Sequence, residues 1–151
     1  MINIEFPNIC SQCKGKCCQG YAGLCLPNDI GDKSNIVENS ISLIKTGKWT
    51  IDCWEGDPRP NGKLGQVWFI RPAHKDSIGK LIDRPWGGVC CLWTIESGCS
   101  LTLEKRPFQC RVLRPKKSYQ CGLNQQYGKE YVALKWIPFQ DQVEEIISRC
   151  S

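Results

Sequence analysis

The residues best suited to chemistry in this chain are its 12 cysteines among 151 residues. Four of them, Cys10, Cys13, Cys17 and Cys18, fall in the stretch CSQCKGKCC. The C-x-x-C spacing of the first two lets a tight turn direct two thiolates at one metal ion, and Gly15 can supply the positive φ of that turn. A redox dithiol is expected within a βαβ unit, and no such pattern precedes this stretch. Because adjacent side chains point in different directions, Cys17 and Cys18 suit two nearby metal sites or one polynuclear cluster.

A second group of cysteines lies further along the chain. Its members are Cys90, Cys91, Cys99, Cys110 and Cys121. The gaps between them are too long for one compact metal knuckle, so we expect single ligands delivered by successive loops. Burial without a ligand role is the alternative, because free cysteine behaves as a small apolar side chain. We favour burial for Cys53 and Cys150, and we leave Cys25 and Cys90 open.

The combined pattern resembles the YkgJ-type cysteine-cluster family, a zinc- or iron-chelating CxxCxxCC domain to which flagellin lysine N-methylase is related. CSQCKGKCC is similar to the C-x-x-C-x-x-x-C-C element of that family. LPNDI is similar to its Pro-then-acid-Ile element through Pro27, Asp29 and Ile30. CLWTIESGC and RPFQCR are similar to its later Gly-Cys and Arg-Pro-x-x-Cys-Arg elements. The resemblance covers roughly residues 10–30 and 88–121.

The resemblance implies a set of eight metal ligands. The set is Cys10, Cys13, Cys17, Cys18, Cys91, Cys99, Cys110 and Cys121. Arg106 and Arg111 flank Cys110, and their charges would offset those of bound thiolates and lower the thiol pKa values, so we predict that both contact the cofactor. A structural ion pair of Arg106 with Asp29 or Glu104 is the alternative.

Two kinds of metal centre fit an all-thiolate ligand set. Eight thiolates can form two Zn(Cys)₄ sites or ligate iron–sulfur clusters, and the number of ligands does not discriminate between them. The spacing is close to a ferredoxin-type run and the related methylase favours iron, so we slightly prefer an iron–sulfur cluster. His74 lies in the polar stretch PAHKDS and is expected at the surface, not in a mixed zinc site. The stretch CSLTLEKRP lacks the tyrosine that many family members carry there and is one residue longer, so the loop before Cys110 is expected to differ.

Length and composition predict one domain over residues 1–151. The N-terminal stretch has no basic segment followed by an apolar one, and no apolar run approaches the length of a membrane span. We therefore expect a cytoplasmic protein with reduced thiols and no membrane contact. The formal net charge is +5, and eight thiolates holding two Zn²⁺ ions would lower it by about four units. RPKK at residues 114–117 is expected to be a solvated loop, and a nucleic-acid partner is not expected.

The fold class that we expect is α+β. It is a small, loop-rich single domain organised around a Cys-ligated metal centre, with a few strands and two or three short helices. Apolar spacing predicts helices over residues 34–46 and 139–150. Residues 64–71 and 129–137 are rich in residues that favour strands, and we predict a strand in each. The stretch DPRPNG within residues 48–63 predicts a loop.

Three classes of function remain open at this point. The first is a metal- or cluster-binding protein that acts on another protein in electron transfer, in metal or cluster delivery, or as an accessory. The second is a methylation enzyme or its accessory. Independent catalysis is disfavoured because no G-x-G-x-x-G follows a strand and the chain has little room for a cofactor domain. The third is a zinc-stabilised protein or nucleic-acid interaction module, which would need an exposed basic stripe with aromatic residues.

Overall fold

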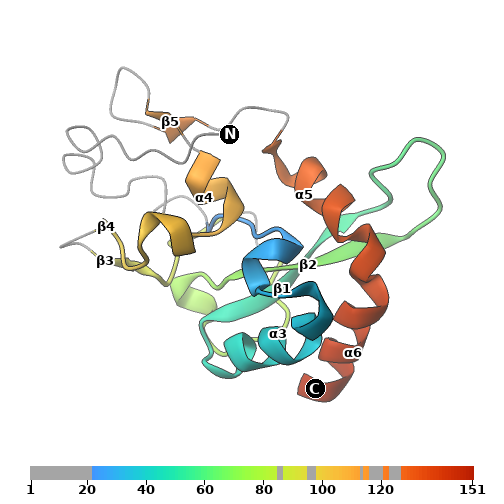
Figure 1. Cartoon of the computed structure of the whole chain (residues 1–151), viewed down its shortest axis with the longest axis horizontal. Coiled ribbons are helices and arrows are strands. Elements are labelled where there is room, and N and C mark those ends of the chain that lie inside the picture. The colour runs from blue at the N-terminus through green and yellow to red at the C-terminus, as the bar shows by residue number, and fades with distance from the viewer. Residues whose placement is uncertain (1–21, 85–86, 95–97, 113, 116–120, 123–126) are drawn as a thin grey trace.

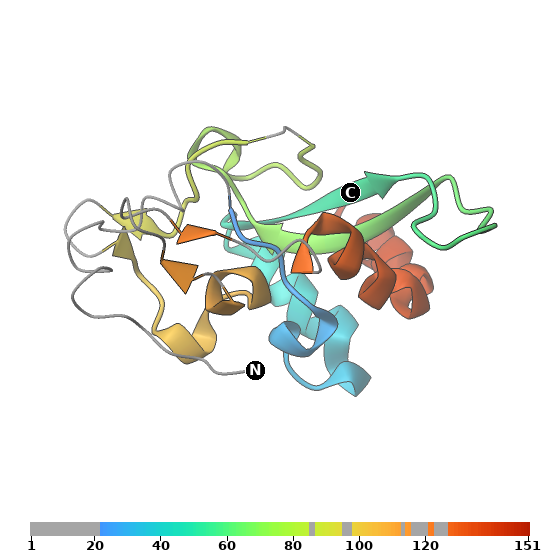
Figure 2. The same ribbon diagram turned by 90° about the horizontal axis from the view of Figure 1, so that it is seen from above.

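The computed structural model of the chain describes residues 22–84, 87–94, 98–112, 114–115, 121–122 and 127–151. Its strands and helices follow one another in separate stretches, which is the predicted α+β class (Figure 1). A two-stranded antiparallel hairpin lies between the longer helices and a set of short elements that carry the second cysteine group (Figures 1 and 2). Within the described stretches, no helix is long and apolar enough to pass through a bilayer.

The hairpin consists of β1 (Trp49–Glu55) and β2 (Gln66–Pro72), in a register that pairs Ile51 with Ile70. β2 confirms the strand predicted over residues 64–71. β1 begins inside the stretch for which the sequence predicts only a loop, and DPRPNG itself forms the turn between the strands. This turn extends beyond the helices in both views (Figures 1 and 2).

Each edge of the hairpin has a hydrogen-bonding partner. Along β1, Ile51 N donates to Leu81 O and Asp83 N donates to Ile51 O, both at 2.9 Å. Along β2, the Gln140 side chain takes the place of a strand, because Trp68 N donates to its Oε1 at 2.7 Å and its Nε2 donates to Trp68 O at 2.9 Å. These bonds satisfy edge groups that would otherwise invite pairing with another chain.

Helix α3 (Ile36–Lys45) follows the short 3-10 helix η2 (Lys33–Asn35) and confirms the helix predicted over residues 34–46. Asp32 begins this helical stretch, because its side chain accepts a hydrogen bond from Ser34 N at 3.0 Å. α3 packs against β1 and against the C-terminal helix.

The C-terminal part of the chain is helical. It consists of α5 (Lys129–Trp136), the 3-10 helix η6 (Ile137–Phe139) and α6 (Gln140–Cys150). α6 confirms the helix predicted over residues 139–150 and packs against α3 and β2.

The strand predicted over residues 129–137 is wrong, because these residues form α5. Val132, Ala133 and Trp136 are fully buried, and their spacing places them on one side of a helix that packs against β2. Tyr131 and Val132 favour strands in isolation, but burial of this helical face decides the conformation.

The main core lies between the hairpin, α3, α5, α6 and the segment after the first cysteine group. Its buried members are Leu24, Cys25, Ile30, Ile36, Ile41, Ile51, Val67, Phe69, Ile70, Val132, Ala133, Trp136, Val143 and Ile146. Residues distant in sequence therefore contribute to one apolar interior, and the segment from Leu24 to Ile30 is part of it.

Short elements complete the fold. They are the 3-10 helices η1 (Pro27–Ile30), η3 (Lys75–Ser77) and η4 (Leu103–Lys105), the helix α4 (Phe108–Val112), and the two-residue strands β3 (Trp93–Thr94), β4 (Gly98–Cys99), β5 (Arg114–Pro115) and β6 (Cys121–Gly122). β3 pairs with β4, and β5 pairs with β6. The second cysteine group is therefore distributed over loops and very short elements, as its spacing predicts.

Candidate metal centre

The predicted ligands differ in how much of each the structure describes. Cys10, Cys13, Cys17 and Cys18 lie outside the described residues. Cys121 is described in its backbone, where β6 pairs it with Pro115. The side chains of Cys91, Cys99 and Cys110 are described, and each is partly exposed.

Two of these ligands belong to a small apolar cluster. Its buried members are Ala22, Cys90 and Leu92, and Trp49, Cys91, Trp93, Cys99 and Leu101 pack around them. Ala22 is the first described residue after the first cysteine group. Cys91 and Cys99 therefore lie in the cluster into which the chain leads from the first cysteine group.

Backbone groups contact both sulfur atoms in this cluster. Leu101 N donates to Cys99 Sγ at 3.4 Å, and Cys91 Sγ donates to Lys48 O at 3.3 Å. Burial raises the pKa of Cys91, so its sulfur is a protonated thiol at neutral pH. Binding of a metal ion would release that proton, because the thiolate is the form that ligates metals.

Cys110 lies directly on the backbone of the segment that follows the first cysteine group. A Cβ atom at Gly23 would overlap Cys110 Sγ and would lie 3.3 Å from the Cys110 nitrogen. Glycine at this position therefore leaves the space in which the Cys110 sulfur sits. Sequence reasoning missed this role, because nothing near Gly23 in the chain points to Cys110.

Hydrogen bonds between Leu24 and Gln109, the neighbours of Gly23 and Cys110, join the same two segments. Leu24 N donates to Gln109 Oε1 at 2.9 Å, and Gln109 N donates to Leu24 O at 3.2 Å. The Gln109 side chain is buried and also donates to Tyr127 O at 3.2 Å. Gln109 therefore fixes the segment after the first cysteine group to α4 through one backbone and one side-chain hydrogen bond.

Asp29 is the strongest polar link between these segments. Its Oδ2 accepts from Leu26 N and from Phe108 N, both at 2.8 Å, and its Oδ1 lies 2.7 Å from Arg111 Nη1. Phe108 is the first residue of α4, so the carboxylate also lies at the positive end of that short helix. Asp29, the acidic residue of LPNDI, thus binds both its own segment and α4, the helix that bears Cys110.

The two arginines beside Cys110 are held by protein groups. Arg111 pairs with Asp29, and its Nη1 also donates to Arg106 O at 3.0 Å. Arg106 Nε donates to Leu101 O at 3.0 Å. Asp29 thus has an ion-pair partner in Arg111, and the alternative of an ion pair of Arg106 with Asp29 or Glu104 stays open. Contact of either guanidinium with a cofactor stays a prediction.

Cys25, which sequence reasoning leaves open, is fully buried in the main core. Burial raises the pKa of its thiol well above the ordinary value, and the nearby Asp29, Cys110 and Cys90 raise it further. Its carbonyl accepts a hydrogen bond from Trp136 Nε1 at 2.8 Å. Cys25 thus lies near two cysteines of the second group, and its backbone is anchored to α5.

The remaining cysteines are those for which the sequence predicts burial or leaves the role open. Cys53 is 3% exposed, which confirms that it is buried, and its lack of a ligand role stays a prediction. Cys150 is partly buried at the end of α6, where it packs against the main core. Cys90 is 4% exposed, and burial raises its pKa to about 12.

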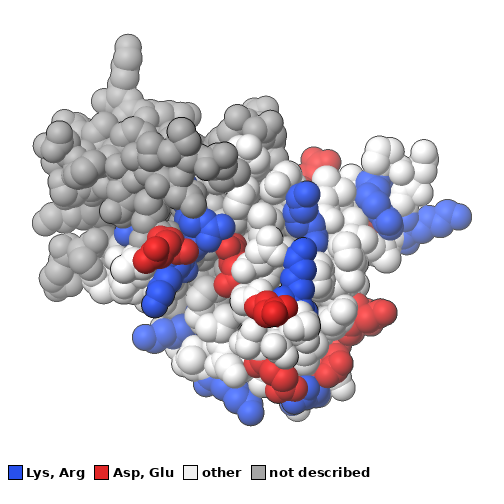
Figure 3. Space-filling model, in the orientation of Figure 1, with Lys and Arg blue, Asp and Glu red and all other residues white. Residues whose placement is uncertain are grey.

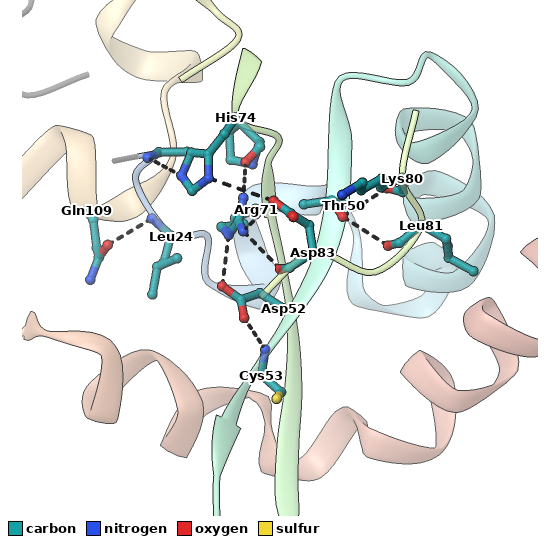
Figure 4. Close-up of polar contacts among 12 residues, drawn as sticks. Leu24, Thr50, Asp52, Cys53, Arg71, His74, Lys80, Leu81, Asp83 and Gln109 are labelled. Carbon is teal, nitrogen blue, oxygen red and sulfur yellow. Dashed lines mark hydrogen bonds and ion pairs between the residues drawn. The ribbon is translucent and has the colours of Figure 1, made fainter. Parts of the chain in front are cut away.

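A buried network of charged groups lies beside the candidate centre (Figure 4). The Arg71 guanidinium is 1% exposed and pairs with Asp52 Oδ2 at 2.9 Å and Asp83 Oδ2 at 3.1 Å. It also donates to Pro72 O at 3.0 Å and to Asp83 O at 2.9 Å. Sequence reasoning missed this network, because a single charged residue within an apolar strand does not show which acids will meet it.

The prediction that His74 lies at the surface is wrong. Its side chain is 5% exposed, and its Nδ1 lies 3.7 Å from Asp83 Oδ2. Burial and the charge of Arg71 lower the pKa of His74, so the imidazole is neutral at pH 7. The polar stretch around His74 is partly exposed to solvent. The His74 ring nevertheless points inward, because the residue lies just after the end of β2.

The described cysteines alone do not complete a metal site. Among the residues that the structure places, no three Cys, His, Asp or Glu side chains come close enough together to hold a metal ion. The described residues fit an all-thiolate centre. Each described candidate ligand is a cysteine, and Gly23 leaves room for the sulfur of Cys110. The predicted ligand set takes its other members from the first cysteine group and Cys121, and their part in the site stays a prediction.

Comparison of the chain with protein-family models, curated proteins and solved structures finds no match. The resemblance to the YkgJ-type family therefore stays a prediction that depends on the motif residues alone.

Proposed function

We propose that this protein is a cytoplasmic cysteine-cluster protein that holds a metal centre between its two cysteine groups and acts on a partner protein. The observation that carries the proposal is the link through Asp29, which joins the segment after the first group to the helix that bears Cys110. A shared centre requires the two groups to meet, and this link lies where that would happen.

Chain length supports the same conclusion. Ala22 is the fourth residue after Cys18, and an extended chain covers at most about 3.6 Å per residue. The Cα atom of Cys18 must therefore lie within about 14 Å of Ala22. Ala22 packs in the same cluster as Cys91 and Cys99, so the length of the chain allows Cys18 to approach two predicted ligands of the second group.

The hydrogen bonds also agree with the resemblance. LPNDI and RPFQCR are separate motif elements in the sequence, and Asp29 of the first pairs with Arg111 of the second. Asp29 and Arg111 neutralise each other beside the Cys110 thiol. This ion pair is a physical reason for the two motif elements to occur together with the cysteines. The family relationship remains part of this proposal.

The centre would hold either an iron–sulfur cluster, which we prefer, or zinc. An iron–sulfur cluster supplies one-electron chemistry and zinc supplies folding energy. Cys10, Cys13, Cys17, Cys18, Cys91, Cys99, Cys110 and Cys121 would hold the metal. Arg111 would balance part of the thiolate charge. The ion pair with Asp29 already offsets the positive charge of Arg111, which reduces this contribution.

A partner protein suits the surface better than a nucleic acid. On the described part of the face in Figure 3, Lys and Arg side chains are interspersed with Asp and Glu. Nucleic-acid binding draws its affinity from a continuous basic surface, and a mixed surface does not supply one. Binding to a protein tolerates a mixture of charges.

The test is to measure metal and acid-labile sulfide in protein purified without air, together with its visible spectrum. Iron with sulfide would establish a cluster, and zinc without colour would establish a zinc centre. Cys13→Ser and Cys110→Ser should lower both the metal content and the urea midpoint, whereas Cys150→Ser should leave the metal content unchanged. Absence of a stoichiometric metal in the wild type, or full loading of both ligand variants, would overturn the proposal.

A further inference from the structure

His74 occupies a junction between three parts of the fold. It follows β2 by two residues, and its backbone pairs with Cys90 in an isolated antiparallel bridge. Cys91 N donates to Ala73 O at 2.9 Å within the same bridge. The chain at His74 therefore fixes the backbone that carries the first two cysteines of the second group.

The imidazole of His74 bonds the chain that follows the first cysteine group. Ala22 N donates to His74 Nε2 at 3.2 Å, and this hydrogen bond is buried. A ring nitrogen that accepts a hydrogen bond carries no proton, so the proton of the neutral ring is on Nδ1. Nδ1 faces Asp83 Oδ2 at 3.7 Å, which favours this tautomer electrostatically.

The ring is held in one orientation from two further sides. A Cβ atom at Gly88 would lie 2.8 Å from His74 Cγ, so the imidazole packs against bare backbone there. Asp83 is itself held by Arg71, which binds both its carboxylate and its carbonyl (Figure 4). The contact with Gly88 and the nearby Asp83 carboxylate thus favour the direction of Nε2 toward Ala22, while Nδ1 itself makes no hydrogen bond in the described part of the chain.

We infer that His74 is a positioning residue that aligns the two cysteine groups: the backbone on either side of it bonds Cys91 and Val89 through Ala73 and Lys75, and its Nε2 holds the chain at Ala22. This inference deepens the proposed function and rests on it, because alignment matters only if the two groups share a centre. The resemblance does not include His74, and neither block of similar residues contains it.

The test compares two amide variants of His74. In His74→Gln, the side-chain oxygen reaches about as far as Nε2 and can still accept from Ala22 N. In His74→Asn, the amide is one methylene shorter and cannot reach it. Thr50→Val is the matched control, because it removes hydrogen bonds to Lys80 O and Leu81 O in the same hairpin without touching Ala22 or Cys90.

Two measurements are made on each protein purified without air: hydrogen–deuterium exchange at the Ala22 amide, and metal content per chain. We expect about tenfold faster exchange at Ala22 and lower metal content in His74→Asn. His74→Gln should recover both, and Thr50→Val should lose stability while keeping its metal and its protection at Ala22. Unchanged exchange at Ala22 in His74→Asn, or equal metal loss in Thr50→Val, would overturn the inference.

The result also separates this inference from the proposed function. If the wild type holds no metal, the proposed function fails, and with it the alignment of ligands that we infer for His74. If the wild type holds metal and His74→Asn holds as much, only the role of His74 fails. If His74→Asn does not fold, His74→Gln decides: wild-type exchange at Ala22 and full metal support the inference, and metal loss with that exchange retained contradicts it.

Discussion

Asp29 Oδ1 and Arg111 Nη1 lie 2.7 Å apart, although the two residues belong to opposite halves of the chain. Both side chains are largely shielded, with the Asp29 side chain 7% exposed and the Arg111 side chain 19% exposed. Charged partners shielded in this way depend on each other, because the loss of one leaves the other desolvated and unpaired. This pair holds the segment after the first cysteine group to the helix that bears Cys110.

Replacement of Asp29 by alanine should therefore destabilise the protein. The change leaves the Arg111 guanidinium without its ion pair and the N–H groups of Leu26 and Phe108 without their acceptor. We expect the free energy of unfolding to fall by about 2–4 kcal/mol. Urea denaturation followed by tryptophan fluorescence measures this change.

The matched control is Glu38→Ala. Glu38 forms an ion pair with Arg149, but both side chains are exposed, so its loss should barely move the urea midpoint. Equal midpoints for Asp29→Ala and the wild type would show that the carboxylate does not hold the two segments together.

Replacement of Gly23 by alanine should displace the Cys110 sulfur. The added methyl group would occupy the space of Cys110 Sγ, so either the sulfur or the backbone must move. We expect lower metal content and a loss of about 1–3 kcal/mol in unfolding free energy, as for other overpacked sites. Metal analysis and urea denaturation of the same preparation check both effects.

Gly65→Ala is the control for this change. A Cβ atom at Gly65 would meet no other atom within 4 Å, so the same substitution adds a methyl group to open space. It should leave metal content unchanged. Full metal loading in Gly23→Ala would mean that Cys110 is not a ligand or that the site adjusts without cost.

Outside the predicted ligand set, cysteine alkylation should distinguish the buried thiols of Cys90 and Cys25 from the partly exposed thiol of Cys150. The thiolate is the reactive form, and burial raises the pKa of Cys90 to about 12. Raising the pH from 7 to 9 still leaves only about one Cys90 thiol in a thousand ionised. Iodoacetamide at pH 9 should therefore spare Cys90 and Cys25 in the native protein while labelling Cys150, as read by peptide mass spectrometry.

The same reaction in concentrated urea should label all three cysteines, because unfolding exposes Cys90 and Cys25 and returns the pKa values of these two thiols to the ordinary range near 8.5. The sign follows from the direction of the shift: folding suppresses ionisation of Cys90, so rising pH favours the unfolded chain. Rapid labelling of Cys90 in the native protein at pH 9 would contradict its buried position.

Replacement of Arg71 by lysine should be poorly tolerated despite conservation of charge. The guanidinium bonds two acids and two carbonyls at once, and an ammonium on a flexible stem cannot match this fork. We expect a loss of about 2–4 kcal/mol in unfolding free energy. Urea denaturation measures it, with Arg84→Lys as control, since Arg84 pairs with Glu55 in solvent. A small effect in both variants would show that the network contributes little.

The sequence by itself determined the elements whose signals are local. Apolar spacing located α3 and α6, strand-favouring residues located β2, and DPRPNG located the turn of the hairpin. The spacing of the second cysteine group indicated its distribution over loops and very short elements, and the ligand role of these cysteines stays a prediction. In each case neighbours along the chain carry the information, so no distant partner is needed to read it.

Tertiary structure alone decided the features that depend on distant partners. Residues 129–137 became a helix because Val132, Ala133 and Trp136 pack against the hairpin, which outweighs their strand preference. His74 is buried because Ala22 and Asp83 converge on it from elsewhere in the chain. Desolvation of a polar group is tolerated only where a partner is present, and no local pattern in the sequence says where that partner will be.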